Sequence, residues 1–268
     1  MQKKHQYFFF SILSVMLLFS CSEYQKILNN DDLTAKYKAA EDYYNKGEYR
    51  RANRLFEQLV PAYRGKPQAE RLVFFFADSY FNTKNYHLAA YQFENFIKSY
   101  PKSQKIEEVS FLAAKSYYMI SPNYSLDQAD TFKGLEKLQI FINNYPDSEY
   151  LEESNKLISE LQNKIEKKEF EIAKQYYTIY DYKAAITSLD NFIGEFVGTK
   201  FREEALFYKF LSSYEIAMNS VDSKKIERLN ELTQLHGAII RYYPETLFEK
   251  DLSKKMKAIE KEINTFAN

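Results

Sequence analysis

The stretch AERLVFFFADSYFNTKNYHLAAYQFENFIKSY, residues 69–100, decides the fold. In its first half the small residue Ala77 is followed three positions later by Tyr80, and in its second half Ala89 is followed four positions later by Phe93. Side chains three or four positions apart lie on one face of an α-helix. Each half therefore predicts a helix, and the polar residues between the halves predict a turn.

The same pattern recurs at a spacing of 37 residues on both sides of this stretch. The positions in register are Ala40, Ala77 and Ala114; Tyr43, Tyr80 and Tyr117; Ala52 and Ala89; and Phe56 and Phe93. The pattern resembles the tetratricopeptide repeat, whose unit is a pair of antiparallel helices. Small residues let the paired helices approach closely, and aromatic residues fill the space between pairs. We therefore expect an all-α tetratricopeptide-repeat solenoid of about five helix pairs.

Insertions divide the expected array into two parts. Repeats 1–3 occupy residues 33–147, with a longer turn inside the third repeat. Fourteen extra residues precede the fourth repeat. Fourteen residues make nearly four helical turns, so a helix can lengthen by that amount and keep the same face inward. The sequence thus predicts one long helix, or a nearly continuous pair of helices, over residues 148–178, and this segment with repeats 4 and 5 fills residues 148–268.

The N-terminal segment has the pattern of an export signal. Residues 7–19 form an apolar run that is too short to span a bilayer as a helix but is typical of a signal peptide. The run ends in LFSC, residues 18–21, which resembles the lipobox of bacterial lipoproteins. We expect residues 1–20 to be a signal peptide, Cys21 to carry the lipid, and residues 21–32 to form a polar tether. An ordinary secretory signal followed by a chance cysteine is the alternative.

A row of aromatic residues follows the first helix of each expected pair. In a tetratricopeptide stack this helix lines the concave face, and its fifth and twelfth positions share one side because they lie seven residues apart. In repeats 1–3 these positions hold Tyr37, Tyr44, Phe74, Phe81, Phe111 and Tyr118. Two interpretations stay open, and both can hold in part. The rings are either core between neighbouring helices or the floor of a groove for an extended or hairpin-like apolar peptide.

Composition argues against several classes of function. The formal net charge is zero, whereas a nucleic-acid binder carries a basic face. Three isolated histidines and one cysteine give no metal-ligand spacing, and there is no glycine-rich phosphate loop. We therefore expect no cofactor, no metal and no nucleic-acid partner, and we expect a binding protein rather than an enzyme.

A lipobox, a brief tether and five repeats that fill the remaining chain resemble the BamD family of lipoproteins, part of the β-barrel assembly machinery. The long helix at the start of the fourth repeat strengthens the resemblance. It implies anchoring in the outer membrane with the protein facing the periplasm, and Ser22 after the cysteine, in place of the Asp of inner-membrane retention, agrees with this. It also implies two partners, the BamA-like barrel subunit and unfolded outer-membrane proteins.

One residue is carried over from the family by position. Arg202 opens the first helix of the fifth repeat, where an arginine of the family contacts the BamA partner. A cation there is not explained by the stability of its own helix, because the helix dipole favours acidic residues at that end. The alternative is a solvated charge paired with a neighbouring glutamate.

Two other functions stay open. One is a different periplasmic tetratricopeptide adaptor lipoprotein, for example of an envelope or division complex. The other is a glycan-capture lipoprotein, which is disfavoured because such proteins are far longer and use surface tryptophan, and this chain has no tryptophan.

Overall fold

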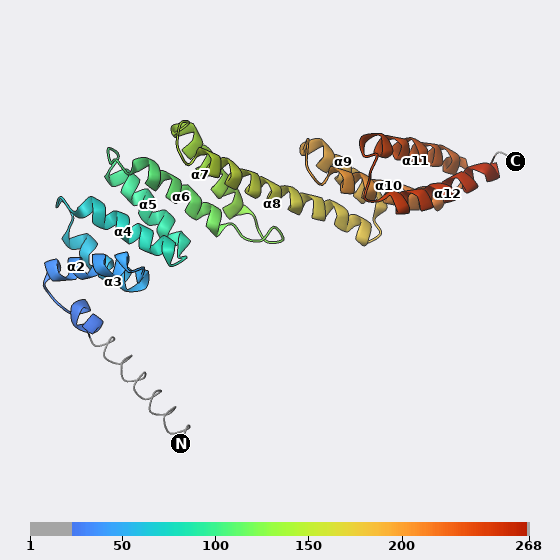
Figure 1. Ribbon diagram of the computed structural model, residues 1–268. Helices are drawn as coiled ribbons and strands as arrows, with labels where there is room; N and C mark the ends of the chain where they lie inside the picture. Colours follow the sequence, from blue (N-terminus) through green and yellow to red (C-terminus); the bar gives the residue numbers. More distant parts are fainter. Residues whose placement is uncertain (1–22, 267–268) are drawn as a thin grey trace, which may run out of the picture. The chain divides into compact units, whose positions relative to one another are not determined.

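The computed structural model describes residues 23–266 of the chain, and these are helices joined by short turns (Figure 1). The chain separates into two compact units. Unit 1 comprises Met1–Pro122 and Ala129–Ile158, and unit 2 comprises Asn123–Gln128 and Ser159–Asn268. The chain passes from one unit to the other within helix α8, Leu151–Thr178.

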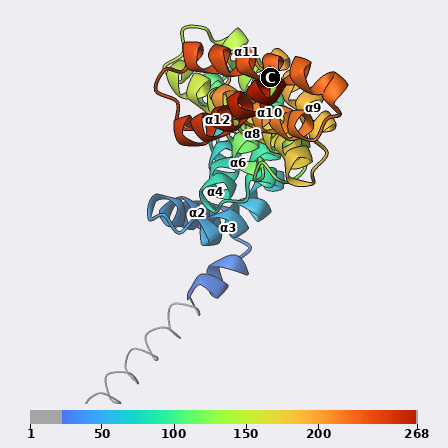
Figure 2. The same ribbon diagram turned by 90° about the vertical axis from the view of Figure 1, so that its right-hand side faces the viewer.

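In unit 1 the successive helices between residues 33 and 144 each pack against the next along the chain (Figures 1 and 2). After a short helical segment at residues 23–28, the helices are α2 Leu33–Asn45, α3 Tyr49–Ala62, α4 Ala69–Asn82, α5 Tyr86–Ser99, α6 Ile106–Ile120, α7 Ala129–Asn144 and the start of α8. Pairs α2–α3, α4–α5 and α6–α7 correspond to the three expected repeats. The predicted fold class, an all-α tetratricopeptide-repeat solenoid, is confirmed.

The residues that define the repeat are the ones that make its core. Ala40, Ala77 and Ala89 are almost completely buried, and so are the rings of Phe56 and Phe93. An alanine at a crossing leaves room for the neighbouring helix, and a buried phenylalanine stabilises the fold by roughly 1.5–3 kcal/mol. The 37-residue period is therefore the period of the packing.

Unit 2 continues the same architecture. Its helices are the remainder of α8, then α9 Tyr182–Glu195, α10 Arg202–Met218, α11 Asp222–Tyr242 and α12 Glu249–Phe266. Helix α8 is continuous over 28 residues, as the fourteen-residue insertion predicts. Helix α11 has 21 residues, so extra residues of the fifth repeat lengthen this helix. Buried residues of α10, α11 and α12, among them Phe210, Leu232 and Leu252, form one core cluster.

Three of the turns within helix pairs need a left-handed backbone residue. In the first repeat this residue is Gly47, with φ of 75°. Lys84 and Tyr180 take the same place in the second and fourth repeats, with φ of 62° and 65°. Glycine adopts this conformation freely, whereas other residues lose roughly 1–2 kcal/mol. The turn geometry is thus imposed by helix packing even where the local sequence disfavours it.

A repeated hydrogen bond connects the first helix of a repeat with the turn that leads into the next repeat, and we call it the inter-repeat latch. In each case a hydroxyl in the turn after one pair donates to a glutamate on the first helix of that pair. The latches are Ser103 Oγ to Glu70 Oε1 (2.6 Å), Thr199 Oγ1 to Glu166 Oε2 (2.8 Å) and Thr246 Oγ1 to Glu203 Oε1 (2.6 Å). The first lies in unit 1 and the other two lie in unit 2, so the latch is a device of the repeat itself.

The segment expected to be a tether differs from that expectation where the structure describes it. Residues 23–28 form a helix whose Tyr24, Ile27 and Leu28 pack against the core of α2 and α3. These three residues are spaced i, i+3 and i+4, which gives a short helix an apolar face. The expected signal peptide and Cys21 lie outside the described residues. Within residues 23–266, no helix combines the length and the apolar character needed to cross a membrane.

Candidate partner-binding surfaces

The aromatic row of unit 1 is divided between buried and half-buried rings. Phe74 and Phe111 keep only 6% and 3% of their surface exposed. Phe111 stacks on Tyr150 with ring centroids 4.5 Å apart, and Phe74 meets Phe96 edge-on at 6.4 Å. These two rings therefore act mainly as packing between repeats.

The other four rings of the row, Tyr37, Tyr44, Phe81 and Tyr118, are half-buried. Tyr37 stacks on Tyr63 at 5.3 Å, and Phe81 meets Tyr86 edge-on at 5.4 Å. Tyr37 and Phe81 are thus supported by neighbouring rings and keep part of their surface accessible. A row of this kind can offer ring faces to a bound peptide without rearrangement.

Tyr44 is held by a hydrogen bond as well as by packing. Its ring stacks on Phe75 at 4.2 Å, and its hydroxyl donates to Asp78 Oδ2 at 2.5 Å. Burial, and then the Asp78 carboxylate, raise the pKa of Tyr44. Burial also raises the pKa of Asp78, and the nearby charge of Glu108 acts in the same direction. The Tyr44 hydroxyl is consequently a fixed hydrogen-bond donor.

The charges between the rings of the row are engaged by neighbouring helices. Glu41 pairs with Arg71 at 3.1 Å, and Lys115 pairs with Glu153 at 2.7 Å. In unit 2 the equivalent Lys174 pairs with Glu204 at 2.8 Å. These charges stabilise contacts between repeats, so a partner would meet them already paired.

A related network lies between α5, α6 and α7. Lys137 Nζ donates to Glu94 Oε1 at 2.6 Å, and the Tyr117 hydroxyl donates to the same oxygen at 3.2 Å. Burial, together with the charge of Glu94, raises the pKa of Tyr117 to about 12. Beside this network is a groove of about 290 Å³ with the small residues Ala113 and Ala114 in its lining.

The side chain of Arg202 is held by a hydrogen bond to the preceding helix, α9. Its Nη1 donates to the main-chain oxygen of Ile193 at 3.4 Å, near the C-terminal end of α9. The last carbonyl groups of a helix lack partners within the helix and carry partial negative charge, so a cation is favourable there. The glutamate pairing considered for Arg202 is not among the ion pairs of residues 23–266. Its side chain is half-buried, and it stabilises the end of α9 rather than the start of its own helix.

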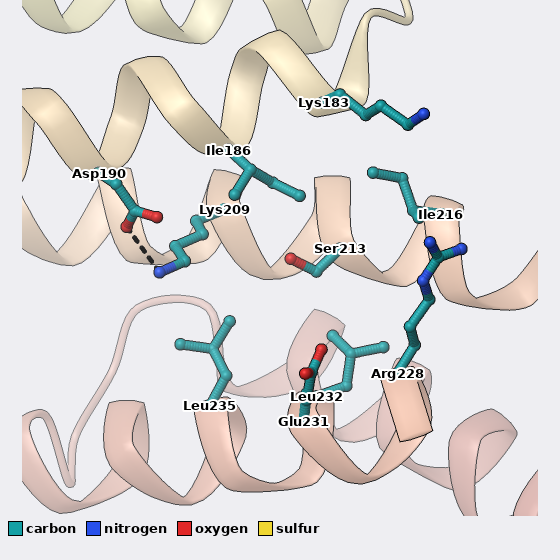
Figure 3. Close-up of a pocket in the computed structure, with 10 residues that line it drawn as sticks. All are labelled: Lys183, Ile186, Asp190, Lys209, Ser213, Ile216, Arg228, Glu231, Leu232 and Leu235. Atoms are coloured by element: carbon teal, nitrogen blue, oxygen red, sulfur yellow. Dashed lines mark hydrogen bonds and ion pairs between the residues drawn. The ribbon is translucent and has the colours of Figure 1, made fainter. Parts of the chain in front are cut away.

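Unit 2 contains a groove between α9, α10 and α11 that sequence analysis missed (Figure 3). It has a volume of about 420 Å³. Its apolar part consists of Ile186 on α9, Ile216 on α10, and Leu232 and Leu235 on α11. The side chain of Ser213 lies between these walls (Figure 3). The groove is wide enough for one or two apolar side chains of a partner.

Charged residues stand around this apolar part. Lys209 Nζ donates to Asp190 Oδ1 at 2.6 Å, as drawn in Figure 3. Lys183 and Arg228 stand toward the opposite end of the groove (Figure 3). Arg202 lies seven positions before Lys209, and both side chains reach α9, so the two cations follow one face of α10. The helical spacing of the lining residues is visible in the sequence, but it also fits an ordinary solvated face.

The described part of the chain holds no cluster of three or more histidine, cysteine, aspartate or glutamate side chains that could bind a metal ion. Several of its polar side chains, such as Lys137 and Glu94 or Lys209 and Asp190, are instead hydrogen-bonded between helices. These surfaces are suited to binding another macromolecule.

Comparison with solved structures finds proteins of low similarity. A kinesin light chain with nearly identical TPR-like repeats from Podosopora anserina is 15% identical, with 78% of this chain and 96% of that chain covered and a TM-score of 0.34. A computationally designed self-assembling cyclic homooligomer is 12% identical, with 95% and 94% covered and a TM-score of 0.15. Neither supports an argument at such scores. Among curated proteins no match is found.

The comparison with protein families is informative. The family model YfiO, described as an outer membrane lipoprotein, matches residues 29–229 and 170–266, which together span nearly all of the described chain. The helix pairs described above lie within these matches. The chain therefore belongs to the YfiO family of outer membrane lipoproteins, which is the BamD family.

Proposed function

We propose that this protein is a non-enzymatic scaffold of the β-barrel assembly complex, anchored by lipid in the outer membrane and facing the periplasm. It binds a BamA-like barrel subunit and helps to receive and insert unfolded outer-membrane proteins. The observation that carries the proposal is the match to the outer-membrane lipoprotein family over nearly the whole described chain. The repeat architecture supports it, because stacked helix pairs offer extended surfaces for other proteins.

The anchor in this proposal is a lipid on Cys21. Cys21→Ala should leave an unprocessed form, because acylation of the thiol precedes signal cleavage in lipoproteins. Metabolic labelling with a fatty acid and fractionation of the envelope measure this directly. A Cys21→Ala chain that is cleaved and sorted like the wild type would contradict the anchor.

Client binding is assigned to the half-buried rings of unit 1. Tyr37, Tyr44, Phe81 and Tyr118 combine accessible ring surface with fixed positions. Segments of barrel proteins alternate apolar and polar residues, and their apolar side chains can pack against ring faces. The rings are pre-ordered by their neighbours, so binding costs little side-chain entropy.

Docking of the barrel subunit is assigned to unit 2. The groove between α9, α10 and α11 offers an apolar centre with charges at its margins. This is the composition of a protein–protein contact, in which an apolar core is surrounded by a polar rim. Arg202 extends the charged margin along α10, and its guanidinium can make two parallel bonds to a partner carboxylate.

Two variants test the docking site by different means. Arg202→Glu reverses the charge at the margin, and Ser213→Phe fills the groove. Ser110→Phe, in the groove of unit 1 between α5 and α7, is the control for added bulk. It also removes the Ser110 Oγ contacts with Ile106 O and the Tyr145 hydroxyl, so its fold is checked together with the other variants. We expect the first two variants to lose the barrel subunit in affinity purification from detergent-solubilised envelopes, and the control to retain it.

Arg202→Glu also removes the hydrogen bond to Ile193, so its fold must be checked by circular dichroism. A reversed charge on the barrel subunit should then restore capture by Arg202→Glu. Capture at the wild-type level by both folded variants would contradict docking in unit 2.

A further inference from the structure

The first described residues are fixed against α3 near the turn that joins it to α2. The Tyr24 hydroxyl donates to the main-chain oxygen of Arg51 at 3.1 Å, and the Tyr24 ring meets Tyr43 edge-on at 5.5 Å. The Arg51 guanidinium lies 5.6 Å from the centroid of the Tyr24 ring. In Figure 2 the short helix that carries Tyr24 lies next to α3. Tyr24 is consequently held at the α2–α3 end of the first repeat.

The short distance in sequence from Tyr24 to Cys21 limits where the membrane can be. Only Ser22 and Glu23 separate them. An extended chain rises at most about 3.6 Å per residue, so the two Cα atoms lie within about 11 Å of each other. The headgroup layer on each side of a bilayer is roughly 5–7 Å thick. A lipid on Cys21, which the proposed function assumes, therefore brings the α2–α3 end of the first repeat to the headgroups.

This end of the repeat carries exposed cations, namely Lys26 on the short helix and Arg50 and Arg54 on α3. Among residues 23–266, none of the three takes part in an ion pair. Arg50 lies in the first turn of α3, where the helix dipole disfavours a positive charge, and that turn contains no acidic residue. Helix stability therefore does not account for these residues.

A hollow lies beside them, between the turn after α2 and the turn after α4. Its volume is about 580 Å³, and its lining includes the cations Arg50, Arg51 and Lys84. Asn82 and Thr83 add hydrogen-bonding groups. The acidic residue of the lining, Glu48, pairs with Arg51 at 2.6 Å. Arginine and lysine around a solvent-filled hollow suit the phosphate of a lipid headgroup.

We propose that Lys26, Arg50 and Arg54, together with this hollow, form a basic surface that binds the anionic headgroups of the leaflet that holds the anchor. This surface would set the orientation of the first repeat relative to the membrane, which a flexible lipid anchor alone does not do. The argument for a lipid occupant is the short covalent reach from Cys21 combined with the charge of the surface. This inference rests on the proposed anchor but not on the barrel subunit.

The test measures headgroup binding without the acyl chains. The mature chain from residue 21 with Cys21→Ser is mixed with vesicles of phosphatidylglycerol and phosphatidylcholine (3:7) or of phosphatidylcholine alone, and flotation gives the partition coefficients. Each cation near an anionic surface strengthens binding roughly five-fold at about 0.1 M salt. Arg50→Glu with Arg54→Glu should therefore weaken partition into the anionic vesicles by at least about 25-fold.

A matched control separates a local surface from overall charge. Arg64→Glu with Lys102→Glu changes the net charge of unit 1 by the same amount at exposed positions outside the basic surface. We expect this control to change partition less than about three-fold, since separated surface charges are screened beyond roughly 10 Å. Equal weakening by both double variants, or equal binding of the unaltered surface to both vesicle types, would overturn the proposal.

Failure of this inference can be told from failure of the proposed function. Processing at Cys21 and capture of the barrel subunit are measured on the acylated chain with and without the Arg50→Glu and Arg54→Glu changes. A chain that is processed and captures the subunit but shows no preference for phosphatidylglycerol refutes the basic surface alone. Loss of processing in the otherwise unaltered chain refutes the anchor.

Discussion

The inter-repeat latch at Thr246 and Glu203 predicts how the C-terminal repeat is held. Glu203 Oε1 accepts a hydrogen bond from Thr246 Oγ1 at 2.6 Å and a second from the main-chain nitrogen of Leu247 at 3.1 Å. Glu203 also lies in the first turn of α10, where the helix dipole favours an acidic residue. The carboxylate thus connects the start of α10 with the turn that leads into α12.

The expected loss follows from the number and type of these bonds. A hydrogen bond to a charged group contributes about 1.5–3 kcal/mol when its partner is buried. The Thr246 side chain is buried, whereas Leu247 is exposed and its amide can bond to water after the change. Glu203→Ala should therefore reduce the free energy of unfolding by about 2–3 kcal/mol. For a chain of this length each kilocalorie lowers the Tm by about 2–4 °C.

The assay is a double-mutant cycle of Glu203→Ala and Thr246→Val, followed by urea unfolding and by hydrogen exchange of α12. The coupling energy should be about 1–2 kcal/mol, because either change removes the same bond. Thr233→Val is the control, since its hydroxyl bonds only within its own helix, to Leu229. Because repeats contact only their neighbours, protection should fall in α11 and α12 before it falls in unit 1. A coupling energy near zero, or uniform loss of protection, would refute the reasoning.

The remaining predictions concern the aromatic row and its carboxylate. Phe74→Ala should lower the free energy of unfolding by about 3–5 kcal/mol because it leaves a cavity. Phe81→Ala should lower it less and weaken client binding more. Thermal melts and peptide titrations compare the two variants, and the reverse order would contradict the division into packing and binding rings. The pKa of Asp78 is raised in the fold, so its ionised form carries a cost that is present above that pKa and relieved as pH falls through it. In urea unfolding, the free energy of unfolding of Asp78→Asn relative to that of the wild type should therefore be higher at pH 7 than at pH 4. A difference that does not depend on pH would argue against a raised pKa of Asp78. Glu108→Gln should lower the pKa of Asp78 in an NMR titration, because one nearby negative charge is removed, and an unchanged titration would exclude that interaction.

The helix pairs could be predicted from the sequence because their signal is local. Ala77 and Tyr80 lie on one face of one helix, and the 37-residue period repeats that face. The long helix α8 follows from the same arithmetic, since fourteen added residues preserve the face. The short helix at residues 23–28 was missed because a polar composition concealed the three apolar residues on one side, Tyr24, Ile27 and Leu28.

The binding surfaces depend on contacts between residues far apart in the sequence, which local sequence patterns do not reveal. Phe111 is covered by Tyr150, 39 positions later in the sequence, so its burial could not be distinguished from exposure in advance. Arg202 contacts Ile193 because the chain turns back between α9 and α10. The groove of unit 2 needs three helices at once, and the spacing on each fits a solvated face equally well.

Equivalent positions of the row hold charges of opposite sign, Glu41 in the first repeat and Lys174 in the fourth, and their ion pairs show that this difference carries no information about a ligand. Glu41 meets Arg71 thirty positions later, and Lys174 meets Glu204 also thirty positions later, so one structural position holds the same bond with its charges exchanged. Lys115 and Glu153 occupy this position in the third repeat, where the longer turn adds eight residues.

The second repeat departs from this rule, since Asp78 and Glu108, again thirty positions apart, carry the same sign. Here Asp78 takes hydrogen bonds from Tyr44 and Asn82, and Glu108 pairs with Lys105 at 2.7 Å on its own side. The contact between the second and third repeats therefore lacks the ion pair that joins the others at this position. Half-buried ion pairs contribute modestly, and here Phe93 and Phe96 of the second repeat share one core cluster with Val109 and Ala113 of the third. We therefore expect that, if clients bind unit 1 as proposed, a basic residue of the client pairs with the Asp78 carboxylate, which accepts a hydrogen bond from the hydroxyl of the half-buried Tyr44.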